Sequence, residues 1–370
     1  MEFSSAEPRL STYLHSRACR EGTPLAGTFE LTPRCNFDCR MCYVHLSAQE
    51  QQRRGPELTA QQWLSIAGDA RDRGMLFLLL TGGEPLLRPD FPELLSQLKK
   101  MGLLVSVNSN GALINEGLLE FFREEPPFRF NITLYGGGND AYSRLCGHPA
   151  YDRVTDNIRA LKKLGIDVKL NVSLTPENAG DLERLLATAE ELGTPVQLST
   201  YMFPPIRRDE TMIGTNARFT PREAAQYAVQ WDKLRFTPEI FRQRAQNLAS
   251  GLELPQEDAC DGTPGEGISC RAGRSSFWIN WQGDMTPCGM MTHPKCSVPE
   301  LGFEAAWERT KAATAAIRLP GACAVCPSKH ACHVCAAMCV TETGQFDRKP
   351  EYLCQMTRET IRQTMKEADL

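Results

Sequence analysis

The sequence predicts an α/β fold, a partial (β/α)6 barrel followed by a smaller cysteine-rich domain, and two observations carry this prediction. Residues 28–202 alternate short apolar runs with amphipathic stretches in six units of roughly 30 residues, the pattern of parallel strands joined by crossover helices. After about residue 250 the alternation ends, and glycine, proline and cysteine become more frequent. A closed barrel of this kind has eight such units, so we expect six to leave it open on one side.

The six predicted strands are apolar runs bounded by turn residues. They cover residues 29–32, 75–81, 103–110, 128–135, 166–174 and 195–203. The second run, MLFLLLT, is apolar throughout, as expected of a strand that is buried on both faces. Ligands of such barrels bind at the carboxyl ends of the strands, so the residues that directly follow each run are the first candidates for a functional site.

Capping residues mark the predicted helices. Thr59 and Gln62 form a capping box, and Thr220 and Glu223 form another around a proline at the first helical position. In the second domain we expect a hairpin around Gly283 and a surface helix near the C-terminus. The hairpin covers residues 275–288 and the surface helix about residues 356–368. The other helices are predicted after Asp90, at 116–123, at 152–165 and after Asn178.

Length and composition indicate a two-domain globular protein. The chain has 370 residues, of which 42% are hydrophobic and 23% charged, with a net charge of −4. We expect an N-terminal extension (1–27), the barrel (28–215), a bridging helical segment (216–250) and the cysteine-rich domain (251–370). The sequence has no basic run suited to a nucleic-acid groove, no stretch of 18 apolar residues and no secretion signal. We therefore predict a cytoplasmic protein that binds neither nucleic acid nor membrane.

Three cysteines lie together on the loop that follows the first predicted strand. Fifteen cysteines in a reducing compartment indicate metal binding and not disulfides. A 4Fe–4S cluster takes one cysteine per iron, so the set Cys35, Cys39 and Cys42 leaves one iron open to a group that is not protein. A zinc site is the alternative, but zinc usually takes four ligands, and His45 alone lies close enough in sequence to complete one.

The Cys-x3-Cys-x2-Cys spacing resembles the cluster loop of the radical S-adenosylmethionine (SAM) superfamily. The resemblance implies that the open iron binds the methionine part of SAM. One electron then cleaves the sulfonium, and the 5′-deoxyadenosyl radical removes a hydrogen atom from the substrate. Residues Gly82, Gly83, Glu84 and Pro85, directly after the second strand, match the family's GGEP segment, which binds the SAM amino group. Glycines there also let a ligand approach the backbone closely; the alternative is a plain strand–helix turn.

Other residues match the family's SAM contacts less closely. Ser109 and Asn110 end the third strand in a stretch similar to the family's TNG segment. Thr133 lies at the end of the fourth strand, where related enzymes place a small polar residue against SAM. The resemblance therefore implies that the loops after three successive strands contribute to one SAM site.

Four residues have two interpretations each. Arg144 is either a fork donor to the SAM carboxylate or a solvated charge, and Asn171 points to the site or to a neighbouring strand. Tyr43 supports the adenine or packs in the core. Cys146, just after the fourth strand, is either a small buried hydrophobe or the donor of a hydrogen atom to a substrate radical, which would make the enzyme an epimerase.

The C-terminal cysteines resemble those of a SPASM domain. This domain belongs to the peptide- and protein-modifying branch of the superfamily and normally carries two auxiliary 4Fe–4S clusters. By resemblance the ligands of an outer cluster are Cys323, Cys326, Cys332 and Cys354. A zinc-ribbon alternative fits less well, because the gap between Cys326 and Cys332 is much shorter than in four-cysteine zinc modules.

The inner auxiliary cluster has an uncertain set of ligands. The resemblance assigns Cys270, Cys288 and one later cysteine to it, and Cys260 is the candidate for a fourth position. The family's usual Cys-x3-Cys step is absent, since position 336 is alanine, so Cys335 and Cys339 compete for the third position. We favour Cys335 because it keeps the ligand loop short.

Taken together, these resemblances predict a radical SAM oxidoreductase with three 4Fe–4S clusters that matures a ribosomal peptide. The leading product is a crosslink such as a thioether or a carbon–carbon bond. The alternatives are maturation of a folded protein, as in anaerobic sulfatase maturation, peptide epimerisation and radical chemistry on a small molecule. An iron–sulfur electron carrier is the non-enzyme alternative, and it would need neither GGEP nor an open iron.

Three kinds of partner are expected. One is the peptide or protein substrate, and another is a reductant such as flavodoxin or ferredoxin. Residues 1–27 are too few for the winged-helix domain that binds a leader peptide in many such enzymes. We therefore expect the leader to be bound by a separate protein or by the SPASM region.

Overall fold

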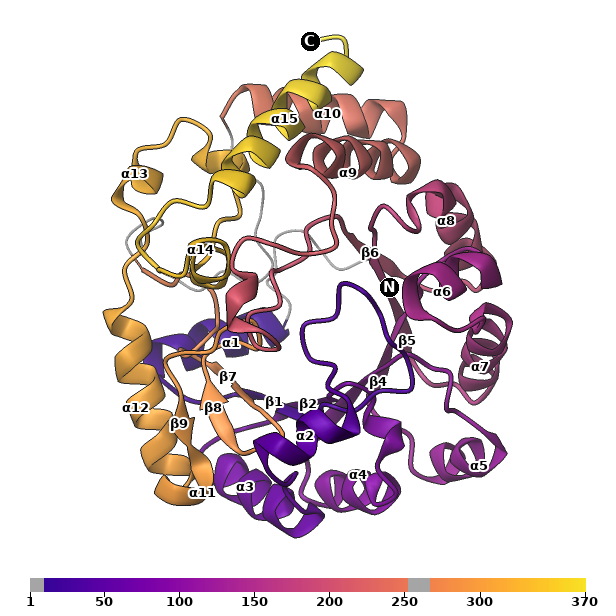
Figure 1. Cartoon of the computed structure of the whole chain (residues 1–370), viewed down its shortest axis with the longest axis vertical. Helices are drawn as coiled ribbons and strands as arrows, with labels where there is room; N and C mark the ends of the chain where they lie inside the picture. The colour runs from indigo at the N-terminus through magenta and orange to yellow at the C-terminus, as the bar shows by residue number, and fades with distance from the viewer. Residues whose placement is uncertain (1–9, 252–266) are drawn as a thin grey trace.

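A nine-stranded sheet curves through the molecule, and most of the helices lie outside it (Figure 1). The computed structural model describes residues 10–251 and 267–370. The strand order is β6-β5-β4-β3-β2-β1-β7-β8-β9, and the neighbours from β6 to β7 are all parallel. The two ends of this order, β6 and β9, are edges, so the sheet is open as predicted.

The six predicted barrel strands are all present. Their bounds are β1 (Ala26–Glu30), β2 (Phe77–Thr81), β3 (Leu104–Ser109), β4 (Arg129–Thr133), β5 (Val168–Ser173) and β6 (Val196–Ser199). Each overlaps the run that predicted it, which confirms the α/β class and the partial barrel. The first strand begins earlier than expected, because Ala26 and Gly27 already pair with β2 and with β7.

The helices that cover the outside of the barrel strands also follow the predicted order. They are α3 (Ala60–Asp72), α4 (Phe91–Lys100), α5 (Glu116–Glu124), α7 (Tyr151–Lys163) and α8 (Leu182–Glu191). Apolar residues of these helices, such as Trp63, Leu94 and Phe122, are fully buried in one core with the outward side chains of the strands. Burial of this apolar surface is the main force that holds helices to the sheet.

Both predicted capping boxes are confirmed, whereas the residue before α4 does not cap its helix. Thr59 and Thr220 accept hydrogen bonds from Gln62 N and Glu223 N in reciprocal capping boxes. Asp90 is the residue before α4, but its carboxylate makes no capping bond. Instead it pairs with the buried guanidinium of Arg88 at 2.7 Å, because a buried cation needs a counter-charge more than a helix end needs one further acceptor.

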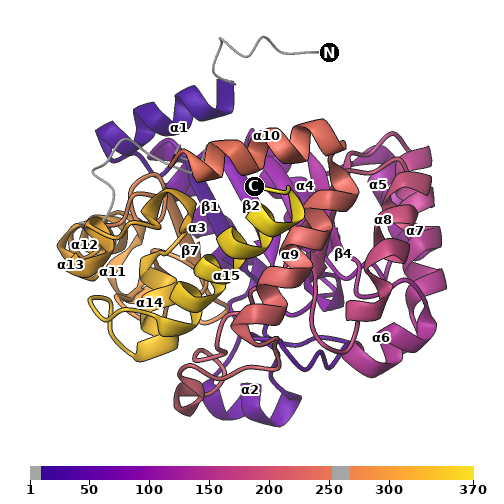
Figure 2. The same cartoon turned by 90° about the horizontal axis from the view of Figure 1, so that it is seen from above.

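Some helices were not predicted from the sequence. α2 (Ala48–Arg54) opens on a capping box made by Ser47 and Glu50, and α6 (Asn139–Cys146) ends at Gly147, whose φ of 78° suits glycine. α1 (Leu10–Glu21) lies on the opposite side of the molecule from α2 (Figure 2). The described helices include none that is both long and apolar enough to cross a bilayer.

The C-terminal region shares the barrel's sheet. β7 (Ser276–Ile279) pairs in parallel with β1, and β8 (Asp284–Thr286) returns beside it through a turn at Gly283, as the hairpin prediction required. β9 (Cys296–Ser297) completes the sheet, and α12 (Phe303–Ala316) packs on its outer face through Phe303 against Phe277. The region predicted as a separate domain therefore continues the wall of the barrel.

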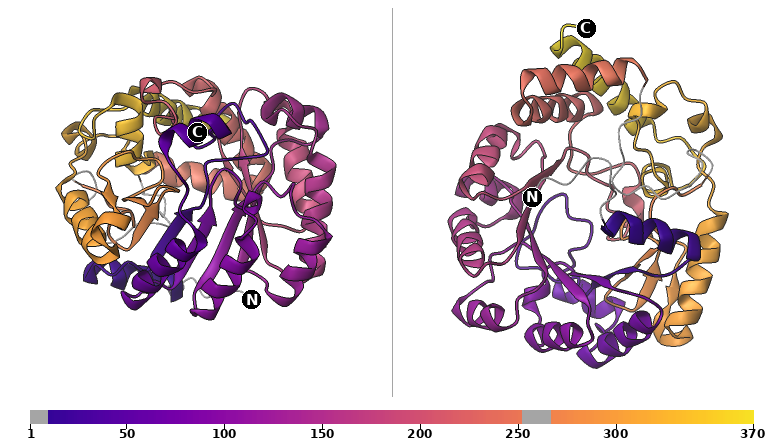
Figure 3. Two further views of the ribbon diagram at one scale, coloured as in Figure 1. Left: turned by 60° about the horizontal axis from the view of Figure 1, so that its bottom comes forward. Right: turned by 180° about the vertical axis from the view of Figure 1, so that it is seen from behind.

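The remaining helices lie beside the gap of the barrel or near the C-terminal cysteines. α15 lies along α9, and it begins five residues earlier than the predicted C-terminal helix (Figures 1 and 3). The bounds are α9 (Pro221–Arg235), α10 (Pro238–Ala249), α11 (Val298–Leu301), α13 (Gly321–Ala324), α14 (Ala336–Thr343) and α15 (Glu351–Glu367). Four short 3-10 turns are η1 (Pro85–Leu87), η2 (Ala179–Asp181), η3 (Glu210–Met212) and η4 (Lys329–Ala331).

Candidate functional site

The three-cysteine loop is held against the loop that follows β2. Gly83 N donates to Thr32 O at 2.7 Å and Glu84 N donates to Arg34 O at 2.8 Å. These bonds extend the β1–β2 pairing past the ends of both strands, so the two loops leave the sheet side by side. The position of Cys35 is thereby tied to the GGEP segment by backbone hydrogen bonds.

This close approach explains the two glycines of the segment. A Cβ atom on Gly82 would lie 2.5 Å from Thr32 O, and one on Gly83 would lie 2.3 Å from Arg34 O. Both distances are far below van der Waals contact. The expectation that these glycines make room for a ligand is therefore incomplete, because the space at their Cβ positions is already taken by the backbone of the three-cysteine loop.

Glu84 joins the loops after β2 and β3. Its side chain is fully buried, and its carboxylate accepts hydrogen bonds from Leu86 N at 3.1 Å, Ser109 Oγ at 2.8 Å and Asn110 N at 2.7 Å. Burial raises the pKa of Glu84 to about 7, although the three hydrogen bonds oppose the rise. Glu84 thus fixes the predicted SAM-binding residues Ser109 and Asn110 relative to GGEP.

Asn110 extends the same network to the first cysteine. Its amide nitrogen donates to Asn36 Oδ1 at 2.8 Å and lies 3.7 Å from Cys35 Sγ. Two backbone amides also point at cysteine sulfurs, Phe37 N at 3.4 Å from Cys35 and His45 N at 3.3 Å from Cys42. Donors aimed at sulfur stabilise thiolate ligands, and they help to set the potential of an iron–sulfur cluster.

The three thiols are poor acids in the protein alone. Burial raises the pKa of Cys35 to about 12 and also raises that of Cys42. A metal centre binds the thiolate and must displace these protons. Three such thiols on one loop, with N–H donors directed at two of them, fit the ligand set of a cluster that leaves one iron open.

Cys146 lies directly behind this loop. It is completely buried at the end of α6, and a hydrogen bond with its thiol raises the pKa of Cys39 well above the usual value. The backbone supports the same contact, since Asp38 N donates to Cys146 O and Arg40 N donates to Leu145 O. The structure thus places Cys146 against a predicted cluster ligand; its role as a hydrogen-atom donor remains a prediction.

The family of the chain follows from this set of loops. Residues 29–189 match the Radical SAM superfamily, and this range contains the three-cysteine loop, GGEP and strands β2 to β5. The chain contains a Radical SAM domain and is an enzyme. An enzyme of this superfamily uses SAM together with an iron–sulfur cluster. The resemblance drawn from the cysteine spacing is therefore confirmed, and the non-catalytic electron carrier is excluded.

Similar proteins span most of the chain. It is 25% identical over 334 residues to the AdoMet-dependent heme synthase of Methanosarcina barkeri, which covers 88% of this chain and 94% of that protein. It is 26% identical over 327 residues to the PqqA peptide cyclase of Streptomyces rochei, which covers 84% of each. Streptococcus suis SuiB bound to its precursor peptide SuiA superposes with a TM-score of 0.67 at 16% identity, over 96% of this chain and 84% of SuiB. This last match shows a shared fold.

The other SAM residues predicted for this radical SAM enzyme occupy two places. Thr133 and Asn171 are register partners on β4 and β5, and both are partly exposed. Arg144 is on α6, where its Nε donates to Glu177 O at 3.2 Å and its side chain lines a cavity of about 270 Å³ with Asp181. The structure therefore brings Thr133 and Asn171 together, whereas Arg144 connects α6 to the loop after β5.

The inner face of the radical SAM barrel is polar, which the sequence interpretation missed. Phe130 and Ile132 of β4 are fully buried in the core with the helices, so the alternate residues face the barrel interior. There Asn131 Nδ2 donates to Asn108 Oδ1 at 2.8 Å, and Lys169 Nζ donates to Gln197 Oε1 at 2.6 Å. The signal was the alternation of polar residues within VSVNSN, FNITL and VKLNVS.

The C-terminal cysteines of the inner set lie near one another. Cys335 is the N-cap residue of α14, and burial raises its pKa to about 12, with the Cys288 and Cys270 thiolates adding to the rise. These electrostatic interactions place the three sulfurs in one neighbourhood. Cys260, the candidate fourth ligand, lies outside the described residues.

The outer set forms a second group. Burial raises the pKa of Cys323, and the thiolates of Cys332 and Cys326 add to that rise. The pKa of Cys354 is likewise raised by burial and by Cys332 and Cys323. Cys339, one turn after Cys335 on α14, is completely buried between the two groups.

Within the described residues, no three His, Cys, Asp or Glu side chains converge closely enough to hold one metal ion. A cubane binds each cysteine through a different iron, so its ligands need not meet at a single point.

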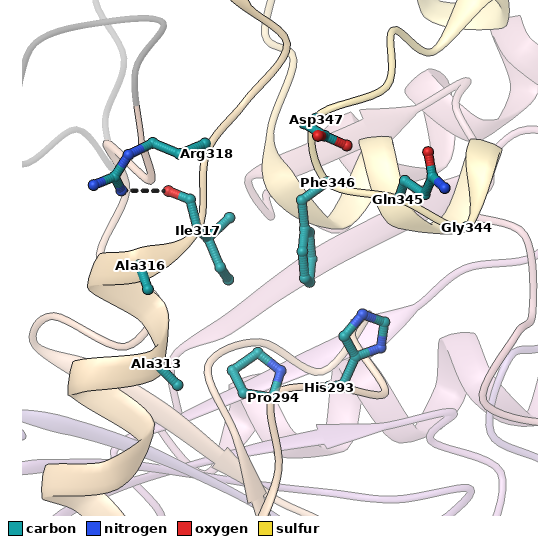
Figure 4. Close-up of a pocket in the computed structure, with 10 residues that line it drawn as sticks. All are labelled: His293, Pro294, Ala313, Ala316, Ile317, Arg318, Gly344, Gln345, Phe346 and Asp347. Carbon is teal, nitrogen blue, oxygen red and sulfur yellow. Dashed lines mark hydrogen bonds between the residues drawn. The ribbon is translucent and has the colours of Figure 1, made fainter.

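A separate cavity of about 650 Å³ opens in the C-terminal region (Figure 4). It lies between the end of α12, the His293–Pro294 segment and the loop after α14. The His293 ring packs on Phe346 with their centroids 4.9 Å apart. The residues that line it are His293, Pro294, Ala313, Ala316, Ile317, Arg318, Gly344, Gln345, Phe346 and Asp347. They include none of the predicted SAM or cluster residues, so this cavity is distinct from the radical SAM site.

Proposed function

We propose that the protein cleaves SAM reductively and uses the 5′-deoxyadenosyl radical to modify a residue of a ribosomally made peptide, with a thioether or carbon–carbon crosslink as the leading product. The observation that carries this proposal is the hydrogen-bonded assembly of the three-cysteine loop, GGEP and Asn110 at the carboxyl ends of β1, β2 and β3. In the radical SAM enzymes that these motifs resemble, the matching segments hold a cluster and SAM together.

The residues of the chain divide the work as follows. Cys35, Cys39 and Cys42 would hold the cluster, which when bound supplies the electron that cleaves the SAM sulfonium. Asn110 and the backbone amides aimed at sulfur stabilise the thiolate ligands. GGEP offers its backbone to the SAM amino group, and Glu84, already bonded to three protein donors, keeps that backbone in place.

The remaining site residues are proposed for orientation of SAM and the substrate. Thr133 and Asn171 project from neighbouring strands beside the site, and Tyr43 would support the adenine. The amides of Asn108 and Asn131 on the inner face offer donors and acceptors that suit the peptide groups of a polypeptide. Arg144 Nε donates to Glu177 O in this structure. Contact of Arg144 with a SAM carboxylate would therefore require this hydrogen bond to break.

The C-terminal cysteines are proposed to hold two auxiliary 4Fe–4S clusters. The inner ligands are Cys270, Cys288 and Cys335, with Cys260 as the candidate for the fourth, and the outer ligands are Cys323, Cys326, Cys332 and Cys354. They would accept the electron that the substrate radical loses, or conduct electrons inward from a flavodoxin or ferredoxin. A separate leader-binding protein or the SPASM region itself would bind the leader of the substrate.

The names of similar proteins support a peptide substrate. PqqA peptide cyclase is a relative along 84% of both chains, and SuiB shares the fold while bound to a precursor peptide. A second candidate, radical chemistry on a small molecule, is favoured by the similarity to AdoMet-dependent heme synthase along 94% of that protein.

Anaerobic reconstitution tests the chemistry first. We expect about twelve irons per chain, four for each of three clusters, and release of 5′-deoxyadenosine and methionine on reduction. Intact SAM in the presence of a fully reduced protein would refute the proposal.

The substrate class is tested with deuterium. A perdeuterated precursor peptide encoded beside the gene should transfer deuterium to 5′-deoxyadenosine and lose mass as it is crosslinked. Deuterium transfer from a tetrapyrrole and none from the peptide would favour the small-molecule candidate.

A further inference from the structure

A buried arginine lies between the three-cysteine loop and the inner auxiliary cysteines. Arg207 belongs to the segment after β6, and its side chain is 13% exposed. Its guanidinium donates to both carboxylate oxygens of Glu30, at 2.7 and 2.8 Å, and to Gly289 O at 2.8 Å. Glu30 ends β1, and Gly289 follows the predicted ligand Cys288, so one side chain touches the polypeptide near both metal sites.

The surroundings of Arg207 leave it little freedom. The rings of Tyr43 and Trp278 each lie 5.9 Å from its guanidinium carbon, and Trp278 Nε1 donates to Glu30 Oε2 at 3.1 Å. A Cβ atom on Gly289 would lie 2.6 Å from the Trp278 indole, so the Gly289 backbone packs flat against that ring. The charge is therefore held in a single geometry relative to both sites.

The backbone of Arg207 is also fixed. Arg54 at the end of α2 donates to Arg207 O at 3.2 Å and to Arg208 O at 2.7 Å. α2 follows the three-cysteine loop directly, so this loop, its helix and the arginine form a connected unit. A fixed guanidinium interacts more strongly with a nearby charge than a mobile one, because the interaction is not averaged over many conformations.

The ion pair has a direction. Arg207 Nη1 bonds both Glu30 Oε2 and Gly289 O, so the guanidinium lies between the carboxylate and the Cys288 segment. The positive end of the pair thus faces the inner auxiliary cysteines, and Glu30, completely buried, lies behind it. Reduction adds negative charge to a cluster, and a nearby positive charge stabilises the reduced state.

We infer that Arg207, oriented by Glu30, is a positioning residue that raises the reduction potential of the inner auxiliary cluster. This inference rests on the proposed auxiliary clusters. A purely structural role for the pair makes a different prediction. Loss of the Arg207 charge and loss of the Glu30 charge should shift the potential in opposite directions only if the charges act on the cluster.

The test is a redox titration of the reconstituted protein, monitored by electron paramagnetic resonance. Arg207→Gln should lower the potential of the inner cluster, with the one-electron reduction constant falling about tenfold, equivalent to about 59 mV. Glu30→Gln, which keeps the shape and loses the charge, should raise it. Arg207→Lys keeps the charge and should stay near the wild-type potential, even though it loses the forked bonds.

Arg218 provides a matched control. It makes another buried ion pair, with Glu342, but its guanidinium carbon lies 3.8 Å from the centroid of the Tyr352 ring. Arg218→Gln should destabilise the protein without moving the inner potential. If Arg207→Gln does not fold, the direction of the potential shift in Glu30→Gln still tests the inference.

The outcomes separate this inference from the proposed function. Arg207→Gln and Glu30→Gln could keep their iron content and show either no shift in the inner potential or shifts of the same sign. Either result would overturn the role of Arg207 and leave the proposed function untouched. About four irons in the wild-type chain would overturn the auxiliary clusters and this inference together.

Discussion

The two cysteine-rich regions of the molecule are built in different ways. The three-cysteine loop leaves a strand of the main sheet and is bonded to the loops after β2 and β3 and to the end of α6. The outer auxiliary cysteines lie on α13, beside η4 and on α15, and the first two of these elements have only four and three residues. The sheet therefore holds the first region, whereas the second has little regular structure of its own, and we expect it to depend on its proposed metal for a fixed shape.

Removal of iron should distinguish the two regions most strongly. Short elements with little core need a metal to stabilise them, so chelation should expose the segment 321–335 to protease at least tenfold faster. The barrel strands should stay protected, because their core is independent of the metal. The measurement is limited proteolysis with mass spectrometry, before and after anaerobic chelation. Equal acceleration of cleavage within β2 to β5 would show that both regions depend on the metal to the same extent.

Gly83→Ala should damage the first site through its packing. The new Cβ would lie 2.3 Å from Arg34 O, which is backbone and cannot move aside cheaply. We expect a loss of about 1–3 kcal/mol in the free energy of unfolding and loss of most SAM cleavage. Gly68→Ala on α3 is the control, since nothing lies within 4 Å of its Cβ position, and it should be neutral or stabilising. Full SAM cleavage in Gly83→Ala would show that the loops can separate.

Glu84→Gln should change the pH dependence of stability in the metal-free protein. Burial raises the Glu84 pKa from 4.5 to about 7, so its contribution is fully present below pH 4.5 and is lost as the pH rises through 7. The slope should approach about 1.4 kcal/mol per pH unit within that window. Glu84→Gln should remove this slope in urea unfolding curves recorded from pH 4.5 to 8. The same slope in both proteins would assign it to another group.

Asn110→Ala should have the smallest effect. It removes the amide that lies 3.7 Å from Cys35 Sγ, and weaker donation to sulfur should lower the potential of the SAM cluster slightly. The auxiliary clusters should be unaffected, which a redox titration that resolves each cluster can show. Asn131→Ala on the inner face is the matched control, because its amide donates to Asn108 and to no cysteine described here. Equal shifts in both variants would argue against a direct effect.

Much of the fold was predictable because its signals are local. Alternating apolar runs and amphipathic stretches place β1 to β6 and their helices, and two capping boxes mark the starts of α3 and α9. α2 and α6 were missed because each is short and lies within a functional loop. The continuation of the sheet by β7 was also missed, since pairing between segments some 250 residues apart leaves no local pattern.

The sequence by itself determined the chemistry of the first site. The spacing of Cys35, Cys39 and Cys42 and the GGEP segment are local strings, so both can be recognised without knowledge of the fold. Only the tertiary structure decided what surrounds them. It brought Cys146 behind Cys39, placed Arg207 between Glu30 and Gly289, and turned the alternate side chains of the strands inward. These contacts depend on the order in which strands pair, and strand order is a property of the whole folded chain.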